Sequence, residues 1–202
     1  MINLQNLKNL ISKNPKHPTT DDFIEIHKGL EGYLRRSLFI GLRLNGVKYE
    51  TSVDVIKMSY LNNRDLLKKT IELITQGTKT LVDFENHNPD LKELENLLFD
   101  FTSIYRNRVV HGVYDRINDQ TELRYCYYID KFFIEEFEST LISLGFKSAF
   151  NKPKDWGAKR TISSELFNQV IKRLSLGKIT KAPRGIIFVQ NSIALTKYNG
   201  KV

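Results

Sequence analysis

An arginine and a histidine stand five residues apart in segment 105–114, whose sequence is YRNRVVHGVY. The arginine is Arg106, the histidine is His111, and Asn107 directly follows the arginine. A guanidinium group binds a phosphoryl group well, and an imidazole transfers protons near neutral pH. No carboxylate or cysteine accompanies the pair within this segment. These residue types therefore suit phosphate chemistry, and a purely structural pair at a helix end is the alternative.

Cleavage of RNA without a metal ion is the reaction that such a pair fits. The 2′-hydroxyl is the nucleophile, so the enzyme needs a base for that hydroxyl and an acid for the leaving oxygen. Arg106 can stabilise the charge that develops on the phosphate. His111 alone performs one proton transfer at a time. A two-fold dimer that pairs two such segments in one cleft would supply both histidines, so we expect activity to require a homodimer.

A helix must position the pair. Asn88 and Pro89 are typical of a helix start, and the apolar spacing after them indicates a helix that ends near the pair. If this helix continues past Gly112, Asn107, His111 and Tyr114 share one face, at i, i+4 and i+7. Arg106 starts about 140° around the helix from His111. The expected apolar stripe consists of Leu91, Leu94, Leu97, Leu98, Phe101, Ile104 and Tyr105.

The stretch Arg106-Asn107-Arg108-Val109-Val110-His111 resembles the R-[polar]-x-x-x-H signature of the HEPN superfamily. Residues 23–46 are similar to the early helix of that bundle, and the resemblance covers about residues 20–146. It implies a mainly α, up-and-down helical bundle that dimerises. It also implies metal-independent endoribonuclease activity, with Arg106 and His111 catalytic and Asn107 orienting the substrate or the histidine.

Many HEPN proteins are toxins or antiviral, abortive-infection effectors, so the resemblance also implies an antitoxin or a defence-system partner. In one toxin branch, a tyrosine two residues after the histidine is modified by a partner nucleotidyltransferase. Val113 occupies that position here and Tyr114 follows it. The alternative function is a non-catalytic HEPN-type module for dimerisation or RNA binding. A basic DNA-binding accessory protein is a third possibility, for which the sequence gives no recognition-helix signal.

The apolar spacing in the rest of the sequence indicates further helices, and the C-terminal tail differs from them in composition. Segment 123–128 is rich in strand formers and is either extended or the start of a helix. Residues 1–146 form the expected helical bundle, and residues 147–202 form a basic C-terminal extension. The expected helices span 2–13, 20–44, 51–61, 64–75, 130–144 and 163–176, and the expected β-hairpin spans 186–196.

Positive charge is concentrated in that extension. Residues 147–202 contain twelve lysines and arginines against two acids, and since the whole chain has a net charge of +8, residues 1–146 have a net charge of −2. Such a basic block fits a polyanion, and RNA is the expected partner. Trp156 either stacks on a base within this block or packs a loop onto the bundle. The residues expected to bind substrate are Arg108, Tyr114, Lys159 and Arg160.

Other residue types exclude several classes of site. The single cysteine, Cys126, excludes an intramolecular disulfide and a cysteine-based zinc site, so we expect no metal and no cofactor. No apolar run approaches the roughly 20 residues of a membrane span, and a reducing cytoplasm is the expected location. His27 fits a surface or hydrogen-bonded structural histidine better than a second catalytic one. His17 and His87 lie in expected turns without a second ligand at metal spacing.

Overall fold

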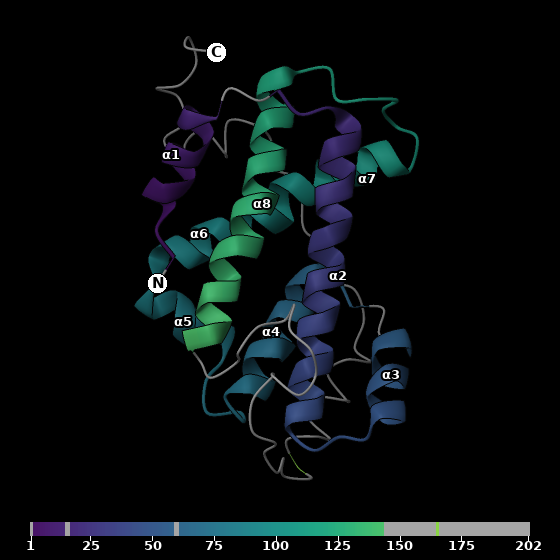
Figure 1. The fold of residues 1–202 in the computed structure, drawn as a ribbon, viewed down its shortest axis with the longest axis vertical. Coiled ribbons are helices and arrows are strands. Elements are labelled where there is room, and N and C mark those ends of the chain that lie inside the picture. The colour runs from purple at the N-terminus through teal and green to yellow at the C-terminus, as the bar shows by residue number, and fades with distance from the viewer. Residues whose placement is uncertain (1, 15–16, 59–60, 144–164, 166–202) are drawn as a thin grey trace. The chain divides into compact units, whose positions relative to one another are not determined.

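The structure is a computed structural model that describes residues 2–14, 17–58, 61–143 and 165. Within these residues it is mainly α-helical and contains no strand (Figure 1). The elements are α1 (Leu4–Lys13), α2 (Thr20–Leu44), α3 (Tyr49–Met58), α4 (Asn63–Ile74), α5 (Leu81–His87), α6 (Pro89–Leu97), the π-helical segment η1 (Leu98–Thr102), α7 (Ser103–Val110) and α8 (Gln120–Ser143). None of the helices in the described ranges is long and apolar enough to cross a membrane.

The described residues divide into two compact units. The first contains residues up to 30 and residues 88–136, and the second contains residues 31–87 and 137–143. Helices α2 and α8 each contribute to both units. The expected boundary between residues 146 and 147 and the expected hairpin lie outside the described residues, as does the expected helix at 163–176 apart from residue 165. These three expectations stay predictions.

Local signals in the sequence account for the ends of α2. The Thr19 hydroxyl accepts a hydrogen bond from the Asp22 amide at 3.1 Å, and the Asp22 carboxylate accepts one from the Thr19 amide at 2.8 Å. This reciprocal pair satisfies amides that the first helical turn leaves without partners. At the other end Gly46 has a φ of 82°, and the helix stops at Leu44 as predicted.

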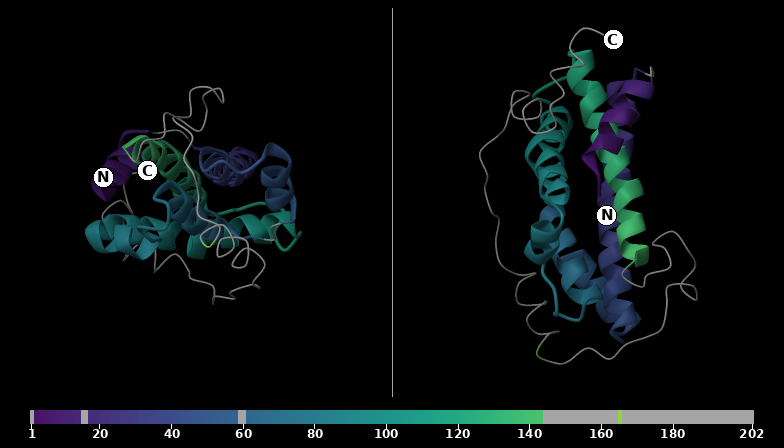
Figure 2. Two further views of the ribbon diagram at one scale, coloured as in Figure 1. Left: turned by 90° about the horizontal axis from the view of Figure 1, so that it is seen from below. Right: turned by 90° about the vertical axis from the view of Figure 1, so that its left-hand side faces the viewer.

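In the first unit, α1 lies beside the N-terminal part of α8 (Figures 1 and 2). The Arg124 guanidinium of α8 donates hydrogen bonds to the carbonyl oxygens of Ile11 and Asn14, at the end of α1. The Leu4 amide donates to the Asp90 carboxylate of α6 at 2.9 Å. Apolar side chains of the helices in this unit pack against one another and form its core. The fully buried members of this core include Leu7, Phe23, Leu30, Leu94, Phe101 and Phe133.

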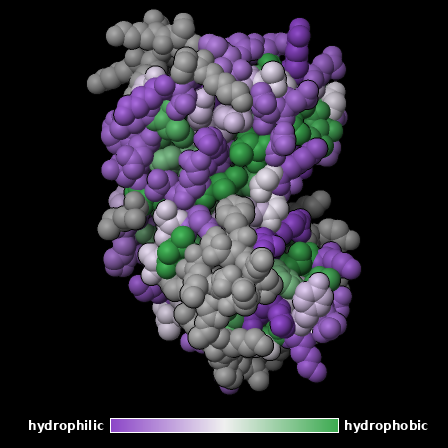
Figure 3. Space-filling model, in the orientation of Figure 1, coloured by the Kyte–Doolittle hydropathy of each residue, from purple (hydrophilic) through white to green (hydrophobic). Residues whose placement is uncertain are grey.

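The second unit packs α3, α4 and the C-terminal part of α2 around another apolar core. Asn45 donates from Nδ2 to the carbonyl oxygens of Gly41 and Leu73, which joins the end of α2 to α4. The Tyr33 hydroxyl donates to the Glu138 carboxylate of α8. The fully buried side chains of this core include Leu34, Leu38, Leu66, Leu67 and Phe137. On the face shown in Figure 3, hydrophilic residues cover most of the described surface.

Two expected helices differ from those in the structure. Helix α3 begins at Tyr49 rather than at Thr51 or Ser52. Ser52 lies inside the helix, where its hydroxyl donates to the Lys48 carbonyl at 2.9 Å instead of capping a helix start. Segment 123–128 is helical and belongs to α8, which begins at Gln120. The expected helix at 130–144 is therefore the later part of a longer helix, and segment 123–128 is helical rather than extended.

Candidate functional site

The candidate site lies at the end of a helical run from Pro89 to Val110, formed by α6, η1 and α7. The run is not α-helical throughout, because Leu98–Thr102 adopts π-helical geometry. The Leu98 carbonyl accepts the Ser103 amide in this turn, and Thr102 Oγ1 and Ser103 Oγ also donate to it, at 2.8 and 3.1 Å. Single π turns within α-helices are frequent near functional sites. The predicted apolar stripe is buried at every position except Ile104, which is half-buried.

A glycine turn ends α7 and places the histidine at the surface. Gly112 has a φ of 69°, its amide donates to the Val109 carbonyl at 3.1 Å, and the Val113 amide donates to the Arg108 carbonyl at 2.8 Å. These two bonds form a Schellman motif, with the glycine in the left-handed position. His111 is consequently the C-terminal cap of α7 and is exposed. The helix therefore does not continue past Gly112.

Because α7 ends at the glycine turn, the polar residues are not arranged as expected. Tyr114 does not lie at i+7 on a helical face with Asn107 and His111, because the chain reverses at Gly112. Instead, the Tyr114 amide donates to the Arg108 carbonyl at 3.0 Å. Tyr114 thus lies next to Arg108.

The arginine of the pair interacts with the residue that follows it. Arg106 is half-buried and donates from Nη1 to the Asn107 side-chain oxygen at 3.0 Å. In the described part of the chain, no hydrogen bond reaches the His111 imidazole. Asn107 therefore contacts the guanidinium rather than the histidine. The structure places Arg106, Asn107 and His111 on the last turns of one helix without joining the arginine to the histidine.

Arg108 is held between two tyrosines. Its guanidinium carbon lies 5.8 Å from the ring centroid of Tyr105 and 5.4 Å from that of Tyr114. Arg108 Nη1 also donates to the Tyr114 hydroxyl at 3.0 Å. Such cation–π contacts contribute about 0.5–1 kcal/mol each at exposed sites. Two of the four residues expected to bind substrate, Arg108 and Tyr114, are therefore brought together by the structure.

Tyr105 connects this arrangement to the core. Its side chain is 7% exposed, and its ring centroid lies 4.9 Å from that of Phe101. Burial raises the pKa of the Tyr105 hydroxyl well above its usual value, and the neighbouring Glu122 carboxylate raises it further. The hydroxyl therefore stays protonated beside Glu122. This contact ties α7 to the first turn of α8.

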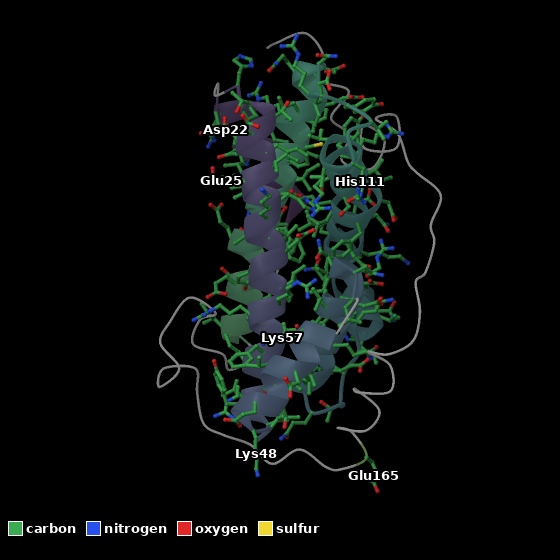
Figure 4. All side chains as sticks on the ribbon, turned by 90° about the vertical axis from the view of Figure 1, so that its right-hand side faces the viewer. Asp22, Glu25, Lys48, Lys57, His111 and Glu165 are labelled. Atoms are coloured by element: carbon green, nitrogen blue, oxygen red, sulfur yellow. The ribbon has the colours of Figure 1, made fainter. Side chains whose placement is uncertain are left out.

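The other sequence-predicted residues lie elsewhere or outside the described ranges. Lys159, Arg160 and Trp156 are outside the described residues. His27 is buried and bonded to Asp130, so it is a structural histidine. Figure 4 shows His111 on α7, and Asp22 and Glu25 at separate positions on α2. Among the described residues, no group of three or more histidines, cysteines and acids could hold a metal ion.

Sequence reasoning did not identify Glu122 as a neighbour of the site. The sequence does contain a signal for this helix start, namely Asp119. In the structure, Asp119 Oδ1 accepts hydrogen bonds from the amides of Thr121 and Glu122, at 2.8 and 3.0 Å. An aspartate with this pattern marks a helix start and would have placed Glu122 in the first turn of α8. The contact with Tyr105 depends on the packing of α7 against α8, which local sequence does not specify.

Comparison of the chain with protein-family models, curated proteins and solved structures gives no match. The chemistry of the site therefore follows from its own residues. An exposed imidazole, a guanidinium oriented by an amide and an arginine braced by two tyrosines lie within ten residues at one helix end. This set can bind a phosphate and move one proton, and it lacks a second proton-transfer group of the same kind.

Proposed function

We propose that the protein is a metal-independent endoribonuclease of HEPN type that acts as a homodimer. The observation that carries the proposal is the exposed His111 imidazole at the cap of α7, five residues after Arg106, whose guanidinium is oriented by Asn107. Both groups sit on a short helix whose end is fixed by the Schellman turn. Their positions are therefore set by backbone hydrogen bonds rather than by a long loop.

The proposed reaction uses two copies of this helix end. His111 of one copy, with a neutral ring, removes the proton of the 2′-hydroxyl, whose oxygen attacks the adjacent phosphorus. The bond to the 5′-oxygen breaks, and a protonated His111 of the second copy gives that oxygen its proton. Arg106 stabilises the extra negative charge on the phosphate. The products are a 2′,3′-cyclic phosphate end and a 5′-hydroxyl end, and the two histidines have exchanged protonation states.

Variants at the pair test this reaction directly. Wild-type protein should cleave RNA in the presence of EDTA. His111→Ala removes both the base and the acid of the dimer and should lower the rate at least about 100-fold. Arg106→Ala removes the cation that stabilises charge on the phosphate and should also lower the rate at least about 100-fold. His87→Ala is the control, because His87 is an exposed histidine whose imidazole contacts only the Asp83 carbonyl among the described residues. Equal rates for wild-type and His111→Ala protein would show that the reaction does not use this site.

The requirement for two copies has its own test. An excess of His111→Ala protein mixed with wild-type protein should suppress cleavage more strongly than simple dilution does, because mixed dimers hold one histidine. We further propose a role as a toxin or antiviral effector, held in check by an antitoxin or a defence partner. Expression of the wild-type chain should then arrest growth, and expression of the His111→Ala variant should not.

A non-catalytic dimerisation or RNA-binding module is the second candidate. The exposed apolar side chains next to His111 favour it, since Val110 is 46% and Val113 is 66% exposed. Covering these apolar side chains with a second copy or another molecule would remove apolar surface from water, which is favourable. Dimerisation or RNA binding by wild-type protein that cleaves no RNA in EDTA would support this second function.

A further inference from the structure

We propose that the Tyr114 ring, braced by Arg108, is a stacking platform for one base of single-stranded RNA beside the Arg106–His111 pair. The inference deepens the proposed function and rests on it for the position of the scissile phosphate. It assigns the substrate class, a single strand, and it gives Arg108 the role of a positioning residue.

The first support is the rigidity of the tyrosine. Three contacts with the same residue hold it: its amide donates to the Arg108 carbonyl at 3.0 Å, its hydroxyl accepts from Arg108 Nη1 at 3.0 Å, and its ring lies 5.4 Å from the guanidinium carbon. Backbone and side chain are therefore both fixed. A fixed aromatic ring loses little conformational entropy when a base stacks on it.

The second support is that Arg108 itself contacts the core of the first unit. The guanidinium of Arg108 also lies 5.8 Å from the Tyr105 ring, which is buried against Phe101. The Tyr105 side chain is only 7% exposed, so it belongs to the core of the first unit. A continuous set of contacts thus runs from the core of the first unit to Tyr114. The platform belongs to the packed unit and not to an independent loop.

The third support is the combination of exposure and charge. The Tyr114 side chain is 38% exposed, so part of its surface is accessible to a ligand. Segment 106–116 contains three arginines, at positions 106, 108 and 116, against a single acid, Asp115. A basic surface with an exposed aromatic ring fits a nucleic acid strand, because phosphates meet cations and bases stack on rings.

The same geometry selects against a duplex. Bases in a double helix already stack on their neighbours, so a single protruding tyrosine gains a base only from an unpaired strand. Stacking accepts any base, because every base has a π-face. We therefore expect binding to depend on strandedness and only weakly on sequence.

Binding measured without cleavage tests the platform. The probe is a short 2′-O-methyl RNA, which has no free 2′-hydroxyl and is not cleaved, compared with its duplex and with an abasic strand of the same length. Wild-type protein should bind the single strand more tightly than the duplex. Tyr114→Ala should weaken binding of the single strand about tenfold, and Tyr114→Phe, which keeps the ring, should weaken it less. The Tyr114→Ala variant should bind the abasic strand as tightly as wild-type protein does.

Two further variants control for general effects of substitution. Tyr49→Ala removes an exposed tyrosine of the second unit, which is 58% exposed and contacts Phe39, and it should leave RNA binding unchanged. Arg108→Lys keeps the positive charge but loses the planar group that contacts both rings. It should therefore weaken binding of the normal strand more than binding of the abasic strand. Circular dichroism should show wild-type helicity for each variant.

The outcomes separate this inference from the proposed function. Wild-type affinity of Tyr114→Ala for the single strand would overturn the platform, even if wild-type protein cleaves RNA. An equal loss of affinity for normal and abasic strands would also overturn it, because the tyrosine would then not act through a base. Loss of self-association in Tyr114→Ala with unchanged RNA affinity would assign the residue to a protein interface and overturn it as well. Tyr114-dependent binding by a protein that cleaves no RNA would support the platform and reject the ribonuclease.

Discussion

The Nδ1 atom of His27 lies 2.6 Å from Oδ2 of Asp130, and both side chains are buried, with exposed fractions of 1% and 0%. This contact joins α2 to α8 in the first unit. The ring of Phe23, one helical turn earlier, packs edge-on against the imidazole at a centroid distance of 5.8 Å. A histidine enclosed in this way has no path to a substrate. It serves the packing of α2 against α8.

Removing the carboxylate should therefore destabilise the protein. Asp130→Ala leaves the His27 ring buried without its carboxylate partner, and we expect the free energy of unfolding to fall by about 3 kcal/mol. Urea unfolding followed by circular dichroism measures the change. Lys131→Ala is the matched control, because Lys131 is the next residue and pairs with Glu135 at 2.8 Å on the surface. That exposed pair contributes at most about 0.5 kcal/mol. Similar losses in both variants would contradict the structural role of the buried contact.

Gly112 offers a test of the turn that ends α7. No atom lies within 4 Å of a Cβ added there, so Gly112→Ala introduces backbone strain at φ 69° and no collision. We expect a loss of about 1 kcal/mol, because an L-residue disfavours the left-handed conformation. Thermal unfolding measures it. Cleavage should slow as well, since the turn positions His111.

Two glycines inside a helix serve as controls, because replacing them with alanine should raise the free energy of unfolding rather than lower it. Gly29 and Gly32 lie in α2, where an added Cβ would also meet open space, and neither has a positive φ. Replacement by alanine should stabilise the protein by about 0.5–1 kcal/mol at each position. Stabilisation by Gly112→Ala as well would show that the Schellman turn does not form.

Several helix ends in both units follow from local sequence. The Thr19–Asp22 cap and the Asn45-Gly46 stop predict α2 from start to end, and Asn62 caps α4 as expected, accepting the Asp65 amide at 2.8 Å. Such signals act within one turn of a helix, so they are readable from neighbouring residues alone. The position of His111 at a helix end is predictable for the same reason, since Gly112 follows it.

Two features could not be predicted because they depend on packing. Segment 123–128 has the composition of a strand but is helical, since Tyr125, Cys126 and Tyr128 are all buried and tertiary packing overrides local propensity. The contact of Arg108 with Tyr114 requires the chain to reverse at Gly112. Glycine after a helix signals such a reversal, but the side-chain partners that it creates follow only from the folded structure.

The Arg124 side chain should hold the end of α1 against α8. Its guanidinium is buried at 6% exposure and donates to two carbonyl oxygens at the end of that helix, those of Ile11 and Asn14. Arg124→Ala should cost about 2 kcal/mol, because hydrogen bonds from charged groups are stronger than neutral ones. Hydrogen exchange should show faster exchange of the α1 amides. Arg116→Ala removes an exposed arginine that bonds Asn118 at 3.1 Å and should leave these amides protected. Unchanged exchange of α1 in Arg124→Ala would refute the attachment.

Cys126 should be inert in the folded protein. It is the single cysteine of the chain and is fully buried in α8. Burial raises the pKa of its thiol well above the usual value, and the negative charges of Asp130 and Glu122 raise it further. The thiolate is the reactive form, so alkylation by iodoacetamide at mildly alkaline pH should be at least roughly 100-fold slower than in unfolded protein. Mass spectrometry measures the extent of labelling. If Cys126 in the folded protein were alkylated as fast as a free thiol, its side chain would be accessible to solvent and the buried position would be wrong.

The same raised pKa predicts how stability changes with pH. A group whose pKa is higher in the folded state binds its proton more tightly there, so its contribution is complete below the unfolded pKa and is lost as pH rises above it. For an unfolded thiol that value is about 8.5, so the free energy of unfolding should begin to fall above about pH 8. Cys126→Ala removes the titrating thiol, and its stability should decline less between about pH 8 and pH 9.5 than that of the wild-type chain, since tyrosines titrate mainly at higher pH. Parallel pH profiles for the two proteins would show that the thiol is not held in its neutral form by the fold.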